Sequence, residues 1–348
     1  MVTLGVDTHK RSHTLVAVDE GGRQLGQLTV AATAEGHLAA LRWAARWRER
    51  RWALEDCRSL SRHLEADLLR VGEAALRVPP KLMTESRKSA RTPGKSDPID
   101  ALAVARAAIR EPDLPVAFLD PAGRELRLLV DHREDLVKER TKVQNRLRWH
   151  LHELDPSFWV KPAGLNRQHV LKAVEARLTC ESSTLASIAL ELVARVRELN
   201  VRVGQLERQI AERVSPAAAN LLGIYGCGAL TAAKLVAETA GVHRFRSRAK
   251  YARHNGSAPI PVWSGNSTRH RLNPSGNRQL NAALHRIAVS HLRGHEPSIA
   301  YVAKRRALGD TKREAMRALK RRLSDDVYRR MLLDHSLATP QGLASAAA

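Results

Sequence analysis

The N-terminal stretch VTLGVDTHKRSHTLVAVDEGGRQLGQLTV (residues 2–30) decides the fold class of the first domain. It holds three short segments with the apolar or alternating pattern of β-strands, at residues 2–7, 14–18 and 24–30. The glycines Gly21–Gly22 lie between the second and third segments, where a tight hairpin turn favours glycine. The stretch therefore predicts three antiparallel strands that form a β-meander.

Helical and strand-like segments alternate after the meander. Apolar residues recur with helical spacing over residues 35–50 and 60–71, and short apolar segments at residues 52–55 and 75–78 predict strands. The pair Pro79–Pro80 ends the second of these strands. A meander followed by alternating helices and strands is the order of a ribonuclease H-like α/β layer, which we expect for the first domain.

A polar loop and one more helix complete this predicted layer. The loop covers residues 84–96 and is basic. Its cations are Arg87, Lys88, Arg91 and Lys95. We expect Asp97 to cap the next helix, because Pro98 follows in the first turn and the apolar pattern runs to about Ile109.

Two long helices are predicted for the middle of the chain, at residues 123–155 and 185–214. The second has a seven-residue repeat in which leucines alternate with β-branched residues, whereas the first matches the repeat less well. The repeat consists of Leu192, Val196, Leu199, Val203, Leu206 and Ile210. An antiparallel hairpin within one chain and a coiled coil between chains both satisfy the pattern. The alternation of leucine with β-branched residues favours the second, and hence a homo-oligomer, as a dimer or tetramer.

The charge of the chain predicts a polyanionic partner. The 348 residues include 58 basic and 36 acidic side chains, a net charge of +22. Residues 216–348 hold 22 of the basic and only 7 of the acidic side chains, a surplus of +15. We therefore expect nucleic acid, DNA in the first place, to bind mainly at the C-terminal third.

Several protein classes are disfavoured by the same sequence. Charged residues interrupt every apolar stretch before the roughly 18 residues that a membrane span needs, and the first residues lack the apolar core of a signal peptide. We therefore expect no membrane contact and a cytoplasmic location. The cysteines Cys57, Cys180 and Cys227 are too far apart for a zinc cluster and odd in number, so oxygen atoms must hold any metal.

Four carboxylates stand where a ribonuclease H-like sheet would bring them together. Asp7 ends the first strand, Glu55 ends the strand at residues 52–55, and Asp97 and Asp100 share one face of a helix. Such acids repel unless hard cations neutralise them, and oxygen ligands suit Mg²⁺ or Mn²⁺. Two ions of this kind stabilise the attacking and leaving oxygens of a phosphodiester. Taken singly, each acid has an ordinary explanation as a turn residue, a surface charge or a helix cap.

The segment LLGIYGCG (residues 221–228), followed by a helix to Ala240, has the pattern of a helix-hairpin-helix. Gly226 and Gly228 permit a tight turn whose backbone N–H groups can meet a phosphate. A plain helical turn with a glycine cap is the alternative. A cluster of cations favours contact with the DNA backbone: Arg244, Arg246, Arg248 and Lys250.

A second basic stretch, residues 251–278, contains serines next to glycines and leads into a helix at residues 279–293. Hydroxyl groups in such loops can approach a phosphate, although a serine–glycine pair by itself is typical of a turn. The serines are Ser257, Ser264 and Ser275. The cations predicted to bind nucleic acid here are Arg269, Arg271 and Arg278.

At these residues the chain resembles a family, the insertion-sequence transposases with an N-terminal RuvC-like DEDD domain and a C-terminal transposase domain that bears a serine. Piv-type DNA invertases are relatives of this family. The resemblance covers nearly the whole chain. Its motifs are GVDTHK (5–10), LED (54–56), KSDPIDALAVA (95–105), LLGIYGCGALTAAKLVAE (221–238) and NGSAP…SG…NPSGNRQL (255–280).

The resemblance implies roles for particular residues. The metal-binding tetrad consists of Asp7, Glu55, Asp97 and Asp100. One C-terminal serine acts as a nucleophile that forms a transient phosphoserine link to DNA. Ser264 is the expected serine because it begins the Ser-Gly pair after Ala258-Pro259, with Ser257 and Ser275 as alternatives. The segment at residues 255–259 departs from the Gly-Leu-Ala-Pro that is common in the family, which affects the local alignment but not the tetrad.

The resemblance also implies a domain plan. A RuvC-like catalytic domain is expected at residues 1–122 and a coiled-coil connector at residues 123–215. A small helical transposase domain, with the helix-hairpin-helix and the serine, is expected at residues 216–336, and a disordered tail at residues 337–348. The fold class is thus α/β plus α.

The function implied is excision and site-specific insertion of an insertion sequence by metal-dependent transesterification of DNA. The resemblance further implies a structured noncoding RNA that pairs with donor and target DNA, although the composition shows nothing specific to RNA. Two other functions stay open. A Holliday-junction-type resolvase or invertase would use the same tetrad on branched DNA, and a basic nucleic-acid-binding protein would not need the tetrad at all.

Overall fold

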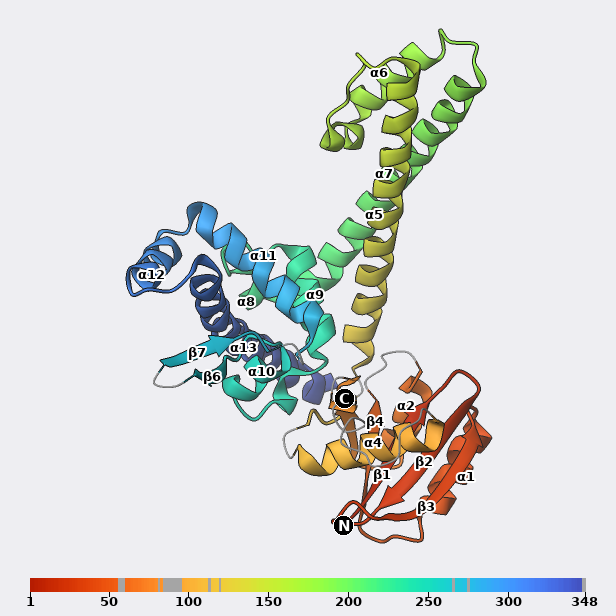
Figure 1. Ribbon diagram of the computed structural model, residues 1–348, viewed down its shortest axis with the longest axis vertical. Coiled ribbons are helices and arrows are strands. Elements are labelled where there is room, and N and C mark those ends of the chain that lie inside the picture. Colours follow the sequence, from red (N-terminus) through yellow and green to blue (C-terminus); the bar gives the residue numbers. More distant parts are fainter. Residues whose placement is uncertain are drawn as a thin grey trace. The chain divides into compact units, whose positions relative to one another are not determined.

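A computed structural model describes the chain except for residues 56–59, 81, 84–95, 112–113, 119, 265–266, 274–275 and 346–348 (Figure 1). The predicted basic loop with Arg87, Lys88, Arg91 and Lys95, and the candidate Ser275, lie outside the described residues. The chain divides into two compact units. One joins Met1–Pro121 with Thr239–Ala348, and the other is Ala122–Glu238. Residues 216–238, which the sequence placed in the C-terminal domain, thus belong to the second unit.

The first unit contains a five-stranded mixed sheet. Its strands are β1 (Val2–Thr8), β2 (Ser12–Val18), β3 (Gln24–Ala31), β4 (Arg50–Glu55) and β5 (Ala75–Val78). They lie in the order β3-β2-β1-β4-β5, with β1, β2 and β3 antiparallel to their neighbours in the meander and β4 and β5 added in parallel. The predicted meander is confirmed, as is the mixed α/β class.

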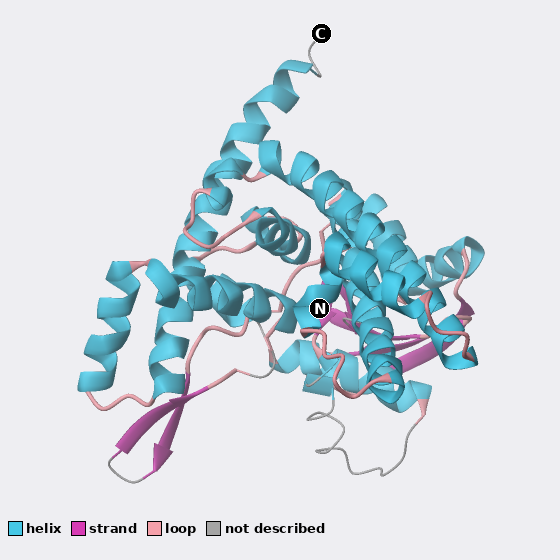
Figure 2. Ribbon diagram, turned by 90° about the horizontal axis from the view of Figure 1, so that it is seen from above, coloured by secondary structure: helices cyan, strands magenta, loops and turns pink. Residues whose placement is uncertain are grey.

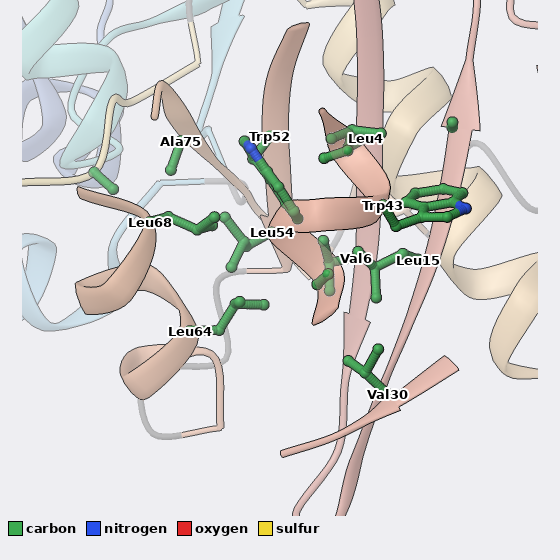
Figure 3. Packing of buried hydrophobic residues seen from close by; sticks show 14 residues of the cluster. Leu4, Val6, Leu15, Val30, Trp43, Trp52, Leu54, Leu64, Leu68 and Ala75 are labelled. Carbon is green, nitrogen blue, oxygen red and sulfur yellow. The ribbon is translucent and has the colours of Figure 1, made fainter. Parts of the chain in front are cut away.

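One face of this sheet is covered by α1 (Ala34–Ala44) and α2 (Arg62–Arg70). Figure 3 shows the core between them, in which Leu4, Trp52 and Leu54 of the central strands are fully buried. The prediction of a helix to Arg50 is wrong, because α1 ends at Ala44. The rings of Trp43 and Trp47 pack in a T-shaped arrangement with 4.9 Å between their centroids, and Arg50 already pairs with β1. Residues 45–49 therefore form the connection between α1 and β4.

The opposite face of the sheet carries α4 (Asp97–Arg110), a helix rich in buried alanines. An added Cβ atom at Gly5 of β1 would lie 2.1 Å from the carbonyl oxygen of Ala101 and 2.6 Å from the amide nitrogen of Ala105. Because glycine and alanine have small side chains, the helix lies directly on β1. The prediction that Asp97 caps this helix is wrong, since Ser96 is the N-cap and Asp97 is the first helical residue.

The second unit is helical. Its elements are α5 (Pro121–Leu154), the 3₁₀ helix η1 (Pro162–Asn166), α6 (Gln168–Leu178), α7 (Thr184–Ala217), α8 (Ala219–Leu222) and α9 (Ala229–Thr239). Figure 1 shows α5 and α7 side by side over much of their length. Ion pairs join Arg133 to Glu207 and Arg195 to Glu139, and Arg140 donates a 3.0 Å hydrogen bond to Asn200. These partners run in opposite directions along the sequence, so the two helices form an antiparallel hairpin.

The predicted apolar repeat of α7 is buried within this unit. Val196, Leu199 and Val203 are at most 3% exposed, and so are Leu206 and Ile210. Around the upper part of the hairpin, Leu147 and Leu151 of α5 join the core with residues of α6 and α7. Much of the repeat is therefore satisfied inside one chain, which is one of the two arrangements that the pattern allowed.

The remainder of the first unit, after Thr239, is largely helical. Its elements are η2 (Val242–Arg244), α10 (Arg248–His254), β6 (Ile260–Ser264), β7 (Ser267–Arg271), α11 (Arg278–Gly294), α12 (Glu296–Ala307) and α13 (Lys312–Ser345). The β6–β7 hairpin, a separate pair of strands in Figure 2, stands where the sequence predicted an irregular loop. Helix α13 ends at Ser345, and the disordered tail predicted for residues 337–348 stays a prediction. Among the described residues, no helix is both long and apolar enough to span a membrane.

Candidate functional site

Two of the four predicted acids lie at the same edge of the sheet. The parallel strands β1 and β4 are in register from Val2 opposite Arg50 to Val6 opposite Leu54. Asp7 and Glu55 each follow this last pair by one residue. The carboxyl ends of neighbouring parallel strands meet at one edge, so the register brings the two acids together.

The other two acids come from the first turn of α4. Asp97 is its first residue and is exposed, whereas Asp100 is 8% exposed and faces the protein. The close approach at Gly5 sets the helix against the strand that carries Asp7. The N-terminal turn of a helix also favours negative charge, because its backbone N–H groups point outward unpaired.

The electrostatics of Asp7 depend on its burial and on the other three acids. Asp7 is only 4% exposed, and its burial raises the pKa of its carboxyl group to about 6. This value includes the charges of Asp100, Glu55 and Asp97, which also raise the pKa, and that of His9, which lowers it. Within the described part of the chain, the buried oxygen Oδ2 of Asp7 has no hydrogen-bond donor. A buried carboxylate oxygen without a donor is costly, so a positively charged ligand would stabilise it.

His9 is a functional candidate that the sequence-based prediction missed. Its Nδ1 atom lies 3.6 Å from Oδ2 of Asp7. Ligand atoms of Asp7, His9 and Asp97 all lie within 4.8 Å of one another. Glu55 and Asp100 are outside this tightest group, although their charges reach Asp7. The sequence carried no clear signal for it, because His9 follows the last residue of β1, and the alternation of side chains along a strand does not extend to it.

The residues of this cluster fit a hard divalent cation. Most of the donors are carboxylate oxygens, which Mg²⁺ and Mn²⁺ prefer, and one of these oxygens is buried without a hydrogen-bond donor. The mutual repulsion that raises the pKa of Asp7 is what such an ion would relieve. The cluster is thus a candidate metal centre.

The candidate serines lie around the β6–β7 hairpin. Ser264 is the last residue of β6 and is opposite Ser267, next to the hairpin turn. Its side chain is outside the described part of the structure. Ser257 follows α10, and its backbone N–H donates a 3.0 Å hydrogen bond to the side chain of Asn255. The structure thus places Ser264 at the tip of a hairpin and Ser257 in a packed loop.

The predicted helix-hairpin-helix segment contains a short turn between α8 and α9. Gly226 has φ +74°, a conformation that favours glycine, and Gly228 has open space where a Cβ atom would lie. Both glycines are exposed. Backbone groups of this turn are therefore accessible to a ligand.

The predicted phosphate-binding cations differ in how far they are engaged by the protein. Arg244 donates to the carbonyl oxygens of Thr239 and Val116 and lies over the ring of Phe245, so it stabilises local structure. Lys250 is half-buried in α10, and the side chain of Arg269 is outside the described part. The exposed cations are Arg246, Arg248, Arg271 and Arg278.

Comparisons with known proteins identify the family of the chain. Residues 4–156 match a family model of the DEDD, IS110 type that is described as a transposase. Residues 218–303 match a second model, described as the IS116/IS110/IS902 transposase family. The two matches cover more than half of the chain and include Asp7, Glu55, Asp97, Asp100 and Ser264. The chain belongs to the IS116/IS110/IS902 transposase family.

Full-length relatives of this family member are encoded by insertion elements. The chain is 26% identical to the uncharacterized 44.8 kDa protein of insertion element IS116 from Streptomyces clavuligerus, over 97% of this chain and 96% of that protein. It is also 26% identical to the uncharacterized 42 kDa protein of insertion element IS900 from Mycobacterium paratuberculosis, over 99% of both chains.

Among solved structures, this transposase is similar to T. thermophilus RuvC in complex with a Holliday junction substrate. The match has 18% sequence identity and a TM-score of 0.25, and it covers 32% of this chain and 94% of RuvC.

Proposed function

We propose that the protein is a transposase that excises an insertion sequence from DNA and inserts it at a specific site by metal-dependent transesterification. One observation carries this proposal. The sheet register sets Asp7 beside Glu55, and the close contact at Gly5 sets the helix of Asp97 and Asp100 against the strand that carries the buried Asp7. A purely DNA-binding protein has no need of such a costly cluster.

The acids would act as ligands. Asp7, Glu55, Asp97 and Asp100 would hold Mg²⁺ or Mn²⁺, with room in this donor set for two ions. A bound pair of such cations polarises a phosphodiester and stabilises charge on its attacking and leaving oxygens. His9 lies close to Asp7 and is about half-exposed. It would orient the Asp7 carboxylate toward the bound DNA.

Ser264 would supply the nucleophile. Its hydroxyl oxygen would form a bond to phosphorus while the bond from phosphorus to one deoxyribose oxygen breaks, and the serine proton would pass to the departing hydroxyl. Attack by a hydroxyl of another strand would reverse these bond changes and restore the serine. The number of phosphodiester-type bonds is conserved, so strand exchange needs no external energy source.

The remaining proposals concern partners. The exposed cations around α10, β7 and α11 and the glycine turn before α9 would bind DNA phosphates. A noncoding RNA would select donor and target DNA by base pairing. The protein would work as a dimer or tetramer, with the long helices of the second unit as its contact.

An excision assay in cells tests the enzymatic proposal. The insertion sequence that encodes the protein is placed on a plasmid, and the protein is supplied separately as wild type or as a variant. Asp7→Asn and Ser264→Ala are expected to lower excision at least a hundredfold, as removal of a metal ligand or nucleophile does. Glu35→Gln and Ser336→Ala are matched controls, because both residues are exposed and lie outside the candidate site.

The variants also separate the alternative functions. If Asp7→Asn abolishes DNA cleavage and Ser264→Ala leaves it intact, the protein is a metal nuclease of the resolvase kind, which activates water. If both variants excise the element at the wild-type rate, the proposed chemistry is wrong.

A further inference from the structure

A second candidate site lies entirely in the C-terminal part of the first unit. It is a cavity of about 550 Å³ lined by the loop at residues 256–259, by β7 and by residues of α12 and α13. A cavity of this size accommodates a nucleotide or a similar small group. The metal cluster around Asp7 contributes no residue to it.

Lys320 of α13 is a buried cation in the wall of this cavity. It is 7% exposed, and its ammonium group donates a hydrogen bond to the neutral side chain of Asn281. Among the described residues, no carboxylate forms an ion pair with it. Burial and, to a lesser extent, the charge of the nearby Arg317 lower the pKa of Lys320 to about 8. A buried ammonium group without a counter-ion is unfavourable unless an anion binds to it.

A second polar group in the same wall also lacks a partner. The hydroxyl oxygen of Ser257 is buried and has no hydrogen-bond partner within the described part of the chain. The loop that carries it is held firmly. Asn255 accepts from the Ser257 N–H at 3.0 Å and donates to Ser324 at 2.7 Å, and Asn281 donates to the Asn255 carbonyl at 3.0 Å. Asn281 thus connects Ser257's loop to Lys320.

The glycine at the start of this loop is required by its surroundings. Gly256 has φ +72°, and an added Cβ atom would lie 3.1 Å from the carbonyl oxygen of Asn273. An added Cβ at Gly276 would lie 2.2 Å from the amide nitrogen of Gly256. Two segments of the C-terminal sequence motif therefore cross here in direct backbone contact, which fixes the wall of the cavity.

The rest of the cavity is positively charged. Arg271 and Arg317 line it, and Arg317 donates to the backbone of His270. The lining also holds two acids, and both are engaged: Asp310 pairs with Arg305, and Glu314 lies 3.8 Å from Arg317 and accepts from Thr311. A metal cation would be repelled by this wall, and an apolar ligand would leave the ammonium group unpaired. An anion with several acceptor oxygens would satisfy both Lys320 and Ser257.

We propose that this cavity binds one phosphate group of a nucleic-acid strand, with the ammonium group of Lys320 and the hydroxyl group of Ser257 as donors. This inference rests on the proposed function only in taking the phosphate from nucleic acid. The site would hold the strand at a fixed point near the β6–β7 hairpin, since His270 and Arg271 of β7 line the cavity. This contact would fix the position of the strand along the protein surface. The exposed cations, in contrast, would bind phosphates of any nucleotide sequence.

The test uses full-length protein with two site variants and one control. Lys320→Gln removes the charge but keeps an amide that can donate to Asn281, so folding is preserved. Ser257→Ala removes only the hydroxyl group. Lys304→Gln is the control, because Lys304 is an exposed lysine on α12 that does not line the cavity. Far-ultraviolet circular dichroism verifies that each variant is folded.

Two probes are measured on each protein. The first is inorganic phosphate, whose binding is followed by the rise in melting temperature. The second is a fluorescent 20-nucleotide strand, as DNA and as RNA, whose affinity is measured by anisotropy at several salt concentrations. Lys320→Gln is expected to abolish the phosphate-induced rise and to weaken strand binding roughly tenfold, and Ser257→Ala to weaken it roughly threefold. The slope of log affinity against log salt should fall by about 0.7 for Lys320→Gln, as for one lost phosphate contact on a single strand.

Each other outcome overturns a stated part of the inference. If Lys320→Gln and Lys304→Gln have equal effects on both probes, the cavity is not a phosphate site. If only the phosphate effect is lost and strand affinity is unchanged, the site takes a phosphate that does not come from nucleic acid. The proposed metal chemistry stands or falls separately, because Lys320→Gln should leave Mn²⁺ binding at Asp7 unchanged.

Discussion

At the scale of single residues, Asp7 has a carboxyl group that is both buried and surrounded by other acids. Its carboxylate is buried at 4% exposure and surrounded by three other acids, which raises its pKa to about 6. The folded, metal-free protein therefore binds this proton more tightly than the unfolded chain, whose value is near 3.8. Stability is gained from this group at low pH and lost as the pH rises from about 4 through about 6.

It follows that Asp7→Asn should stabilise the metal-free protein at pH 8. The amide has no charge to desolvate, and a pKa difference of one unit corresponds to about 1.4 kcal/mol, so a gain of roughly 1–3 kcal/mol is expected. Thermal unfolding in a chelator at pH 8 and at pH 4.5 measures it. The gain should shrink at the lower pH, and a variant that is less stable than wild type at pH 8 would contradict the assignment.

Gly5 is the second residue on which the site depends. A Cβ atom at this position would lie 2.1 Å from the carbonyl oxygen of Ala101, so Gly5→Ala must push α4 away from β1. We expect a loss of stability of about 1–3 kcal/mol, as for other overpacked interiors, and a weaker metal affinity because Asp97 and Asp100 move with the helix. Gly72→Ala is a useful contrast, since it has φ +80° but open space, and should destabilise without altering metal affinity.

The residues that sequence reasoning found and missed differ for a physical reason. Asp7 and Glu55 were predictable because strand ends can be read from apolar patterns and parallel strands share an edge. His9 lies just beyond β1, where no pattern specifies the direction of a side chain. Ser96 and Asp97 are both good caps by composition, and only the backbone geometry decides between them.

At the scale of elements, the hairpin of α5 and α7 depends on the buried apolar face of α7. Leu199 lies in the middle of this face and is 1% exposed. Leu199→Ala should destabilise the protein by about 2–5 kcal/mol, because the hairpin cannot close the cavity left by the side chain. Ile188→Ala, on the same helix but 41% exposed, is the control and should cost much less. Chemical denaturation of the two variants distinguishes them, and equal losses would contradict the assignment of the buried face.

The elements also show where the sequence was not sufficient. The meander was predictable because its strands are apolar and its turn contains two glycines. The β6–β7 hairpin was not, since Pro261 and a run of polar residues mask its two-residue periodicity. Its stability comes from pairing between the two strands, from Ile260 opposite Arg271 to Ser264 opposite Ser267, which a pattern within one strand cannot reveal.

At the scale of the whole molecule, the uneven distribution of charge should govern how DNA binds. The surplus of +15 in residues 216–348 includes exposed arginines at Arg246 and Arg248. Replacing both with glutamine should lower the slope of log affinity against log salt by up to about 1.8 for duplex DNA, at about 0.9 for each lost phosphate contact. The same replacement of the exposed Arg42 and Arg48, in the first domain, should lower it much less. Equal changes in slope would mean that charge acts without regard to its position.

Mn²⁺ binding to the purified protein tests the central claim most directly, because metal retention by the acids around Asp7 precedes any chemistry on DNA. Electron paramagnetic resonance of free Mn²⁺ measures the bound fraction in wild type, Asp7→Asn and the exposed control Glu35→Gln. We predict that wild type and Glu35→Gln remove Mn²⁺ from solution equally and that Asp7→Asn binds it at least tenfold more weakly. Equal Mn²⁺ binding by Asp7→Asn and wild type would contradict the metal centre, and with it the proposed transposase chemistry.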